Sequence, residues 1–156
     1  MKLGTRARYS LRMMMAIAKL SRDGKPAALG EVARDCCLSR GYLDQLAPAL
    51  KNASLVRAHP GRGGGYMLRR PPEQIRLLEI VEATIGPIAI TECAADPGMC
   101  EYSDACNCQD LWSLINFEIS GILNAFTLSD LVSDDWPERI KELRESLTGV
   151  VTEWVQ

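Results

Sequence analysis

The chain has 156 residues and a formal net charge of −2, and 47% of its residues are hydrophobic. This length suits one domain, or one small domain with an appendage, and the apolar fraction can form a core. No apolar run approaches the roughly 18 residues of a membrane-spanning helix. The N-terminus alternates basic and apolar residues without the hydrophobic region of a signal peptide, so we expect a cytoplasmic protein.

The charge is distributed unevenly along the chain. Residues 1–72 contain 14 Lys and Arg against 4 Asp and Glu, a balance of +10, whereas residues 73–156 contain 4 against 16, a balance of −12. Such asymmetry indicates a front half that binds a polyanion such as nucleic acid, and an acidic back half with another role.

Three helices are predicted in the basic half. The spacing of apolar residues predicts the first from Thr5, which can cap it, to about Leu20. Two shorter helices follow around a tight turn, and Ser39 can cap the second of them. Two helices joined in this way are typical of a helix-turn-helix, whose second helix enters the major groove of DNA. Pro48 lies within that second helix and should bend or shorten it.

A small β-hairpin is predicted next. Strands at Leu55–His59 and Tyr66–Arg69 flank the segment 60–65, which reads PGRGGG. A ribbon after a helix-turn-helix is a wing, and Arg62 at its tip suits insertion into a minor groove. A phosphate-binding loop is the alternative, but no Gly-Lys-Ser/Thr sequence follows and no helix begins there. The residues expected to contact DNA are Arg8, Ser39, Arg40, Tyr42, Asp44, Gln45, Lys51, Arg57, His59, Arg62 and Tyr66.

The acidic half is predicted to be helical around a cysteine-rich loop. One helix spans Leu77 to Ile85, a long amphipathic helix runs from Asp110 to about Phe126, and a last one runs from Pro137 to about Trp154. The long helix has an apolar stripe too wide for a lone helix on a small domain, so we expect a dimer interface there. Its members are Leu111, Leu114, Ile115, Ile119, Ile122, Leu123 and Phe126.

We therefore expect a mainly α fold with a small β wing. Residues 1–86 would form a winged helix-turn-helix DNA-binding domain, residues 87–109 a cysteine-rich cluster-binding loop, and residues 110–156 the dimerisation and C-terminal helices.

Four of the six cysteines lie within residues 92–108. These are Cys93, Cys100, Cys106 and Cys108, separated by six, five and one residues. Disulfides need an oxidising compartment, and structural zinc sites usually bring cysteines in pairs about two to four residues apart. An iron–sulfur cluster accepts wider thiolate spacing, so the pattern favours a cluster over zinc or free thiols.

The chain resembles the Rrf2 family of bacterial winged-helix regulators, whose best-known branches are the IscR-like and NsrR-like iron–sulfur sensors. The resemblance covers roughly residues 1–132 and is carried by MKLGTRARYSLRMM, by GGGY-x-L-x-R-P-P, by LEIVEATIGPIAITEC and by the cysteine loop. It implies a homodimer that binds palindromic operators. It also implies a cluster, 2Fe–2S or 4Fe–4S, on Cys93, Cys100 and Cys106, whose loss, oxidation or reaction with nitric oxide changes DNA binding.

Several positions depart from the family pattern. The cysteine gaps are six and five where five and five are usual. Gln109 stands where IscR-like members have a histidine ligand, and Arg8 stands where NsrR-like members have an aspartate that reaches the other subunit's cluster. We therefore predict Cys108 as the fourth ligand, with Asp104 and Asp110 as alternative donors and simple packing of Cys108 as the competing interpretation.

The DNA-contacting part departs as well. The wing arginine has moved within the loop to Arg62, and Asp44 replaces the usual glutamate of the recognition helix, so the operator cannot be carried over. Cys36 and Cys37 occupy the helix-turn-helix turn, where Gln-Gly is frequent. We expect small packing residues there, with a thiol switch as the alternative.

The predicted function is a dimeric, DNA-binding regulator that senses iron–sulfur status, redox state or nitric oxide through a cluster, with 2Fe–2S favoured over 4Fe–4S. One alternative is a cluster-free regulator that uses thiols or a metabolic partner as its signal. An electron-transfer protein or redox enzyme ranks last, because no arrangement of cofactor loop, base or nucleophile is present.

Overall fold

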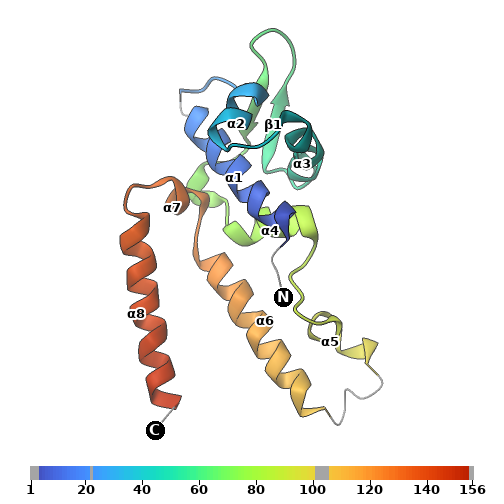
Figure 1. Cartoon of the computed structure of the whole chain (residues 1–156), viewed down its shortest axis with the longest axis vertical. Helices are drawn as coiled ribbons and strands as arrows, with labels where there is room; N and C mark the ends of the chain where they lie inside the picture. The colour runs from blue at the N-terminus through green and yellow to red at the C-terminus, as the bar shows by residue number, and fades with distance from the viewer. Residues whose placement is uncertain (1–3, 22, 101–105, 155–156) are drawn as a thin grey trace.

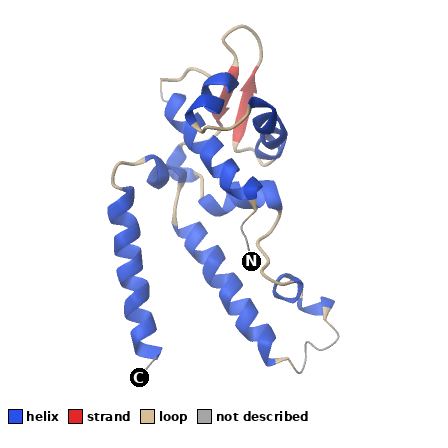
Figure 2. Ribbon diagram, viewed as in Figure 1, coloured by secondary structure: helices blue, strands red, loops and turns tan. Residues whose placement is uncertain are grey.

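Helices make up most of the structure, and a two-stranded wing is the only sheet among the described residues (Figures 1 and 2). The computed structural model describes residues 4–21, 23–100 and 106–154. The predicted mainly α fold with a β wing is confirmed. None of the described helices is long and apolar enough to cross a membrane. The helices are α1 (Thr5–Leu20), α2 (Leu29–Asp35), α3 (Arg40–Asn52), α4 (Leu77–Ile85), α5 (Glu92–Ala95), α6 (Asn107–Ala125), α7 (Leu128–Val132) and α8 (Trp136–Trp154); the strands are β1 (Val56–His59) and β2 (Gly65–Leu68), and 3-10 turns cover Pro72–Gln74 and Pro97–Met99.

Helix α1 forms the centre of the core. Its Met13, Met14 and Ile17 side chains are fully buried, as their helical spacing predicts. The helix packs most extensively against α4 and also contacts α2, α3 and α7. Between α1 and α4 the buried Thr84 hydroxyl donates to Ser10 Oγ at 3.2 Å. Ser10 Oγ donates to the Ala7 carbonyl at 2.8 Å, and Thr84 Oγ1 also lies 3.0 Å from the Val81 carbonyl, so both buried hydroxyls have hydrogen-bond partners.

The helix-turn-helix consists of α2 and α3, as predicted. Ser39 caps α3, because its Oγ accepts a hydrogen bond from the Tyr42 N–H at 3.2 Å. Three fully buried side chains, Leu43, Leu46 and Leu50, fasten α3 to the core. Pro48 is exposed and does not shorten the helix, which continues to Asn52.

The wing is an antiparallel pair anchored to the segment before α2. Its register runs from Val56 opposite Leu68 to His59 opposite Gly65. At its base, Ala27 and Tyr66 exchange two backbone hydrogen bonds of 2.9 Å. A Cβ on Gly65 would overlap the Ala27 carbonyl oxygen, so only glycine allows the two backbones to approach this closely.

The segment after α6 is fastened to the start of α4. The Leu77 N–H donates to the Phe126 carbonyl at 3.1 Å, and the Leu128 N–H donates to the Ile75 carbonyl at 2.8 Å. The Phe126 and Leu128 side chains are buried in the core. These contacts join the end of α6 to the winged helix, while α6 and α8 extend away from it as two arms (Figure 1).

The apolar stripe of α6 divides into two faces, which corrects the prediction of one continuous interface. Ile119 and Leu123 pack against the cluster of Ala7, Val81 and Ile88 on α1, α4 and the segment after α4. The side chains of the second face are exposed, and its apolar members are Leu111, Leu114, Phe117 and Ile122. Periodicity alone could not separate these faces, because both are apolar.

Three other boundaries differ from the predictions. Gly4, not Thr5, holds the cap position of α1, and no side-chain cap is formed. The cysteine loop, expected to be irregular, contains the single-turn helix α5 and the 3-10 turn at Pro97–Met99. Helix α6 begins at Asn107, and therefore includes Cys108.

Candidate DNA interface and cysteine loop

The recognition helix presents a row of polar side chains to solvent. Arg40, Asp44, Gln45 and Lys51 are all exposed on α3, because the opposite face of the helix is buried through its leucines. Ser39 is exposed as well, and its oxygen already accepts the Tyr42 N–H. These five residues lie together on one helix, as a major-groove reader requires.

Two aromatic rings join α1 to α3 beside this row. Tyr9 and Tyr42 stack edge to face, with ring centroids 5.4 Å apart and an angle of 87°. The guanidinium carbons of Arg8 and Arg12 lie 5.5 and 5.6 Å from the Tyr9 centroid. Tyr42 also packs against the hydrophobic core. The contacts with Tyr9 place the two arginines next to the recognition helix, where phosphate contacts are expected.

The wing residues have different environments. Arg57 and Arg62 are exposed, and Arg62 is the only basic residue of the tip loop 60–64. Tyr66 is half-buried and packs against the core, so its side chain has a structural role in the wing base. His59 is half-buried, and its Nε2 atom is buried without a hydrogen-bond partner among the described residues.

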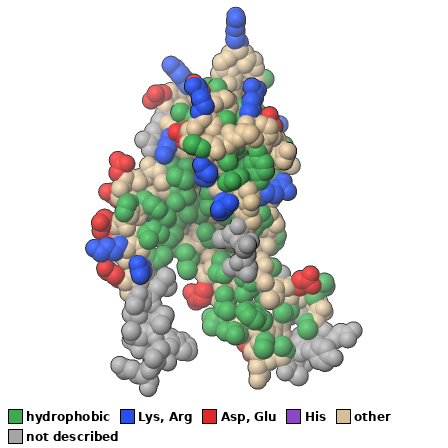
Figure 3. All heavy atoms as spheres, in the orientation of Figure 1, with side chains coloured by type: hydrophobic (Ala, Val, Ile, Leu, Met, Phe, Trp, Pro, Cys, Tyr) green, Lys and Arg blue, Asp and Glu red, His purple; other side chains and the backbone are tan. Residues whose placement is uncertain are grey.

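Basic and acidic side chains separate over the surface. On the face shown in Figure 3, Lys and Arg gather over the winged helix and at the tip of the wing, and acidic side chains border the arm formed by α7 and α8. Helix α8 also carries basic side chains, Arg139 among them, which pairs with Asp130 at 3.3 Å. The separation predicted from the two halves of the chain is visible in three dimensions.

The start of the cysteine loop is tied to α4 and α6. The Ile88 N–H donates to Glu82 Oε1 at 3.3 Å, and the Ile90 N–H donates to Asn116 Oδ1 at 3.2 Å. One residue further on, Thr91 Oγ1 and Cys93 Sγ form a hydrogen bond of 3.3 Å. The first cysteine therefore has a defined position relative to the middle of α6.

The four loop cysteines are free thiols in different environments. Cys93, Cys100 and Cys106 are half-buried, and Cys108 is exposed near the start of α6. Residues 101–105, with the candidate donor Asp104, lie outside the described residues. Within the described ranges no three His, Cys, Asp or Glu side chains are close enough to hold a metal ion. The thiol donors suit an iron–sulfur cluster in number and chemistry, but the described part of the loop does not bring them together.

The two cysteines of the helix-turn-helix turn differ from each other. Cys36 is a core residue with 4% of its surface exposed, as predicted, and burial raises the pKa of its thiol. Cys37 is exposed, and its φ of 51° is left-handed. The prediction of a packing residue is therefore wrong for Cys37. A left-handed φ at this place is a physical reason for a preference for glycine.

Two features of the site were missed in the sequence. Asn116 holds the loop through its side-chain carbonyl, and the signal that pointed to it was a polar residue within an apolar stretch of α6. Phe117 is the most exposed large apolar side chain described on α6. It lies outside the stripe that periodicity selected.

Comparison with known proteins agrees with this arrangement. The model of the Rrf2 family, described as an iron-dependent transcriptional regulator, matches residues 3–134. IscR of Sodalis glossinidius is 34% identical over 135 residues, covering 86% of this chain and 81% of IscR. CymR of Bacillus subtilis is 35% identical over 133 residues, covering 85% and 91%. The CymR structure, described as that of the global cysteine regulator of B. subtilis, aligns with a TM-score of 0.69 at 33% identity and covers 85% of this chain and 96% of that one.

These relatives are transcriptional regulators of the helix-turn-helix type, and the match of the family model spans the winged helix, the cysteine loop, α6 and α7. The chain therefore belongs to the Rrf2 family of DNA-binding transcriptional regulators.

Proposed function

We propose that the protein is a homodimeric regulator whose winged helices bind a palindromic operator and whose cysteine loop holds an iron–sulfur cluster as the sensor. The observation that carries this proposal is the placement of the thiols. They belong to a loop tied to α6 by Asn116, and the far end of α6 is fastened to the winged helix by Phe126 and Leu128. A change at the thiols thus has a continuous connection to the DNA-binding residues.

The exposed row of α3 and the wing support the DNA-binding part. Helix α3 would enter the major groove, Arg62 at the wing tip would enter the adjacent minor groove, and Arg8 would contact phosphate. Two such half-sites one helical turn apart require a dimer. The exposed apolar face of α6 is the surface we assign to dimerisation, because a monomer would leave Leu114 and Phe117 in water.

The cluster ligands would be Cys93, Cys100, Cys106 and Cys108. Thiolates are the common ligands of such clusters, and a bound cluster would supply a centre that reacts with oxidants or nitric oxide. The chain's own contribution is positional. Asn116 fixes the start of the loop, and the Thr91 hydroxyl is placed to donate to the Cys93 thiolate. Because no three of the described donors are close enough to hold a metal ion, cluster binding would require the cysteines to come closer together.

A second candidate is a regulator that senses oxidants or a metabolic partner through the thiols alone. Two observations favour it. The described thiols are not assembled into a site, and the solved structures similar to this chain include the global cysteine regulator CymR. In this case Cys93 or Cys108 would react singly.

Anaerobic purification separates the two candidates. The cluster proposal predicts iron and sulfide in stoichiometric amounts, a visible absorption spectrum, and loss of both in the Ala variants of Cys93, Cys100, Cys106 and Cys108. If Cys108→Ala keeps the wild-type iron content and spectrum while the other three lose theirs, Cys108 is not a ligand. A colourless protein whose operator affinity still responds to thiol oxidation would support the second candidate.

The DNA-binding part is tested on an operator selected from random sequences. Arg62→Ala should weaken binding to that operator by about 1–3 kcal/mol if the side chain enters a groove. Lys51→Ala should weaken all DNA about equally and lower the salt dependence by about one counterion. Unchanged operator affinity of Arg62→Ala would contradict the assignment of the wing.

A further inference from the structure

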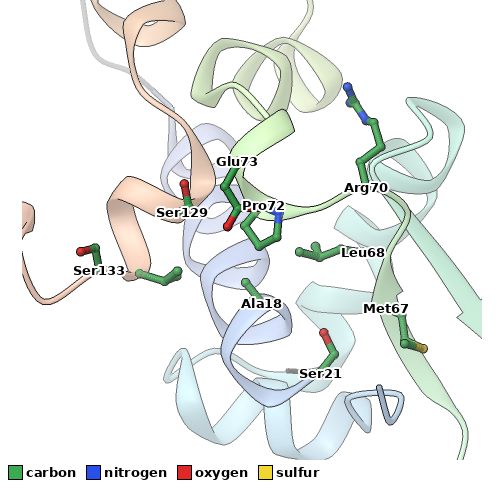
Figure 4. Close-up of a pocket in the computed structure, with 10 residues that line it drawn as sticks. Ala18, Ser21, Met67, Leu68, Arg70, Pro72, Glu73, Ser129 and Ser133 are labelled. Atoms are coloured by element: carbon green, nitrogen blue, oxygen red, sulfur yellow. The ribbon is translucent and has the colours of Figure 1, made fainter. Parts of the chain in front are cut away.

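A cavity of about 520 Å³ lies between the base of the wing and α7 (Figure 4). Its walls come from the end of α1, from β2 with the linker that follows it, and from α7. The volume falls within the range of small-molecule sites, about 300–1,000 Å³. Ala18, Leu68 and Pro72 provide apolar walls, and none of the cysteines lines the cavity.

Two hydroxyls at the cavity offer oxygen lone pairs but no proton. Ser21 Oγ donates its proton to the Ile17 carbonyl at 2.7 Å. Thr127 Oγ1 donates to Asp130 Oδ2 at 2.8 Å. Ser129 must therefore be the donor in its 2.7 Å contact with Thr127, because a hydroxyl carries a single proton. With these hydrogen bonds in place, Ser21 and Ser129 offer acceptor oxygens to a ligand.

Among the described lining residues, Glu73 supplies the charge on the cavity side. The Glu73 carboxylate has no ion-pair partner among the described residues, and in Figure 4 it lies on the side of Pro72 that faces Ser129. Arg70 is the only basic residue of the lining among the residues that the structure describes, and its guanidinium points away from the cavity in Figure 4. Its Nη2 is 2.7 Å from Glu79 Oε2, and its Nη1 donates to the Gln74 carbonyl at 3.2 Å. The cavity thus presents a carboxylate and acceptor oxygens over an apolar floor.

We propose that this cavity binds a small organic cation, a protonated primary amine on a short apolar chain. An ammonium group has three donors and no acceptor, which matches Glu73 and the neighbouring Ser129 and leaves its third N–H to water. The chain would lie against Ala18 and Leu68. A ligand held there contacts the wing base and α7 at once, and so acts on the junction between the DNA-binding domain and the segment that follows α6.

The probe is 3-methylbutylammonium, compared with the neutral 3-methylbutanol and the anionic 3-methylbutanoate, which share its carbon skeleton. The full-length protein is labelled with ¹³C-methyl methionine, because Met67 lines the cavity and Met99 lies on the distant cysteine loop. Met67→Leu assigns the signal. We expect a saturable shift of the Met67 methyl and not of Met99. The ammonium should bind about fivefold more tightly than the alcohol, as a partly solvated ion pair allows, and the anion most weakly.

Two variants decide the assignment. Glu73→Gln should abolish the preference for the ammonium over the alcohol, whereas Glu31→Gln, the same change at an exposed position on α2, should leave it intact. Ser133→Phe, at the exposed rim, should block all three probes. The proposal is overturned if the Met67 signal does not respond, if the three probes bind alike, or if Ser133→Phe binds like the wild type. A Met67 shift that depends only on protein concentration would overturn it too, because a second copy of the chain would then cover the cavity.

Discussion

Truncation of Phe117 to Ala tests the assignment of the exposed face of α6 to dimerisation. The side chain is 72% exposed in the single chain. Full burial of a Phe side chain contributes about 1.5–3 kcal/mol, so covering the exposed part contributes about 1–2 kcal/mol in each subunit. A symmetric dimer contains the residue twice. Phe117→Ala should therefore raise the dimer dissociation constant by about 30-fold to several hundredfold.

The assay is sedimentation velocity over a concentration series. Leu20→Ala is the matched control, because Leu20 is also an exposed apolar side chain, 37% exposed, but lies on α1. Thermal unfolding should show that Phe117→Ala does not unfold the subunit, since its side chain is not in the core. A charge at Ile119 would be a poorer test, because Ile119 packs within its own chain. Equal dissociation constants for Phe117→Ala, Leu20→Ala and the wild type would refute the assignment.

Three further predictions concern the winged helix. Partial burial raises the pKa of the Glu79 carboxyl. This effect is outweighed by the hydrogen bonds from Arg70 and the Arg76 N–H and by the charges of both arginines, so the pKa in the folded state lies below that in the unfolded state. Glu79→Gln should therefore lower the unfolding free energy by up to about 1 kcal/mol at neutral pH. This difference in stability between variant and wild type should disappear as the pH falls through the depressed pKa of Glu79, and a difference that does not change with pH would contradict the prediction. In denaturant unfolding, Gly65→Ala should lower the unfolding free energy by about 2–3 kcal/mol, because its Cβ would meet a backbone carbonyl. The control Gly30→Ala on α2 should raise the unfolding free energy by about 0.5–1 kcal/mol. Equal effects of the two changes would argue against the close approach at the wing base. Alkylation of the native protein followed by mass spectrometry should modify the exposed Cys37 well before the buried Cys36, and equal rates would show that the turn opens.

The elements with local signals could be predicted from the sequence. The cap of α3 at Ser39 and the end of α4 before Gly86-Pro87 were predicted at the observed residues, because capping and chain-breaking act between near neighbours. The glycine-rich tip likewise marked the wing. The resemblance to the Rrf2 family rested on such motifs, and the family assignment is confirmed.

The sequence by itself determined the longer elements and the distribution of charge, but not the short helices α5 and α7. Only the tertiary structure decided what each apolar or polar face meets. Periodicity marked α6 as amphipathic but could not distinguish Ile119, which covers its own domain, from the exposed Leu114. The pairing of Asn116 with Ile90 joins positions 26 residues apart. The cavity beside Glu73 is built from three segments distant in the chain. Such contacts depend on how the helices pack, and no local pattern of residue types encodes them.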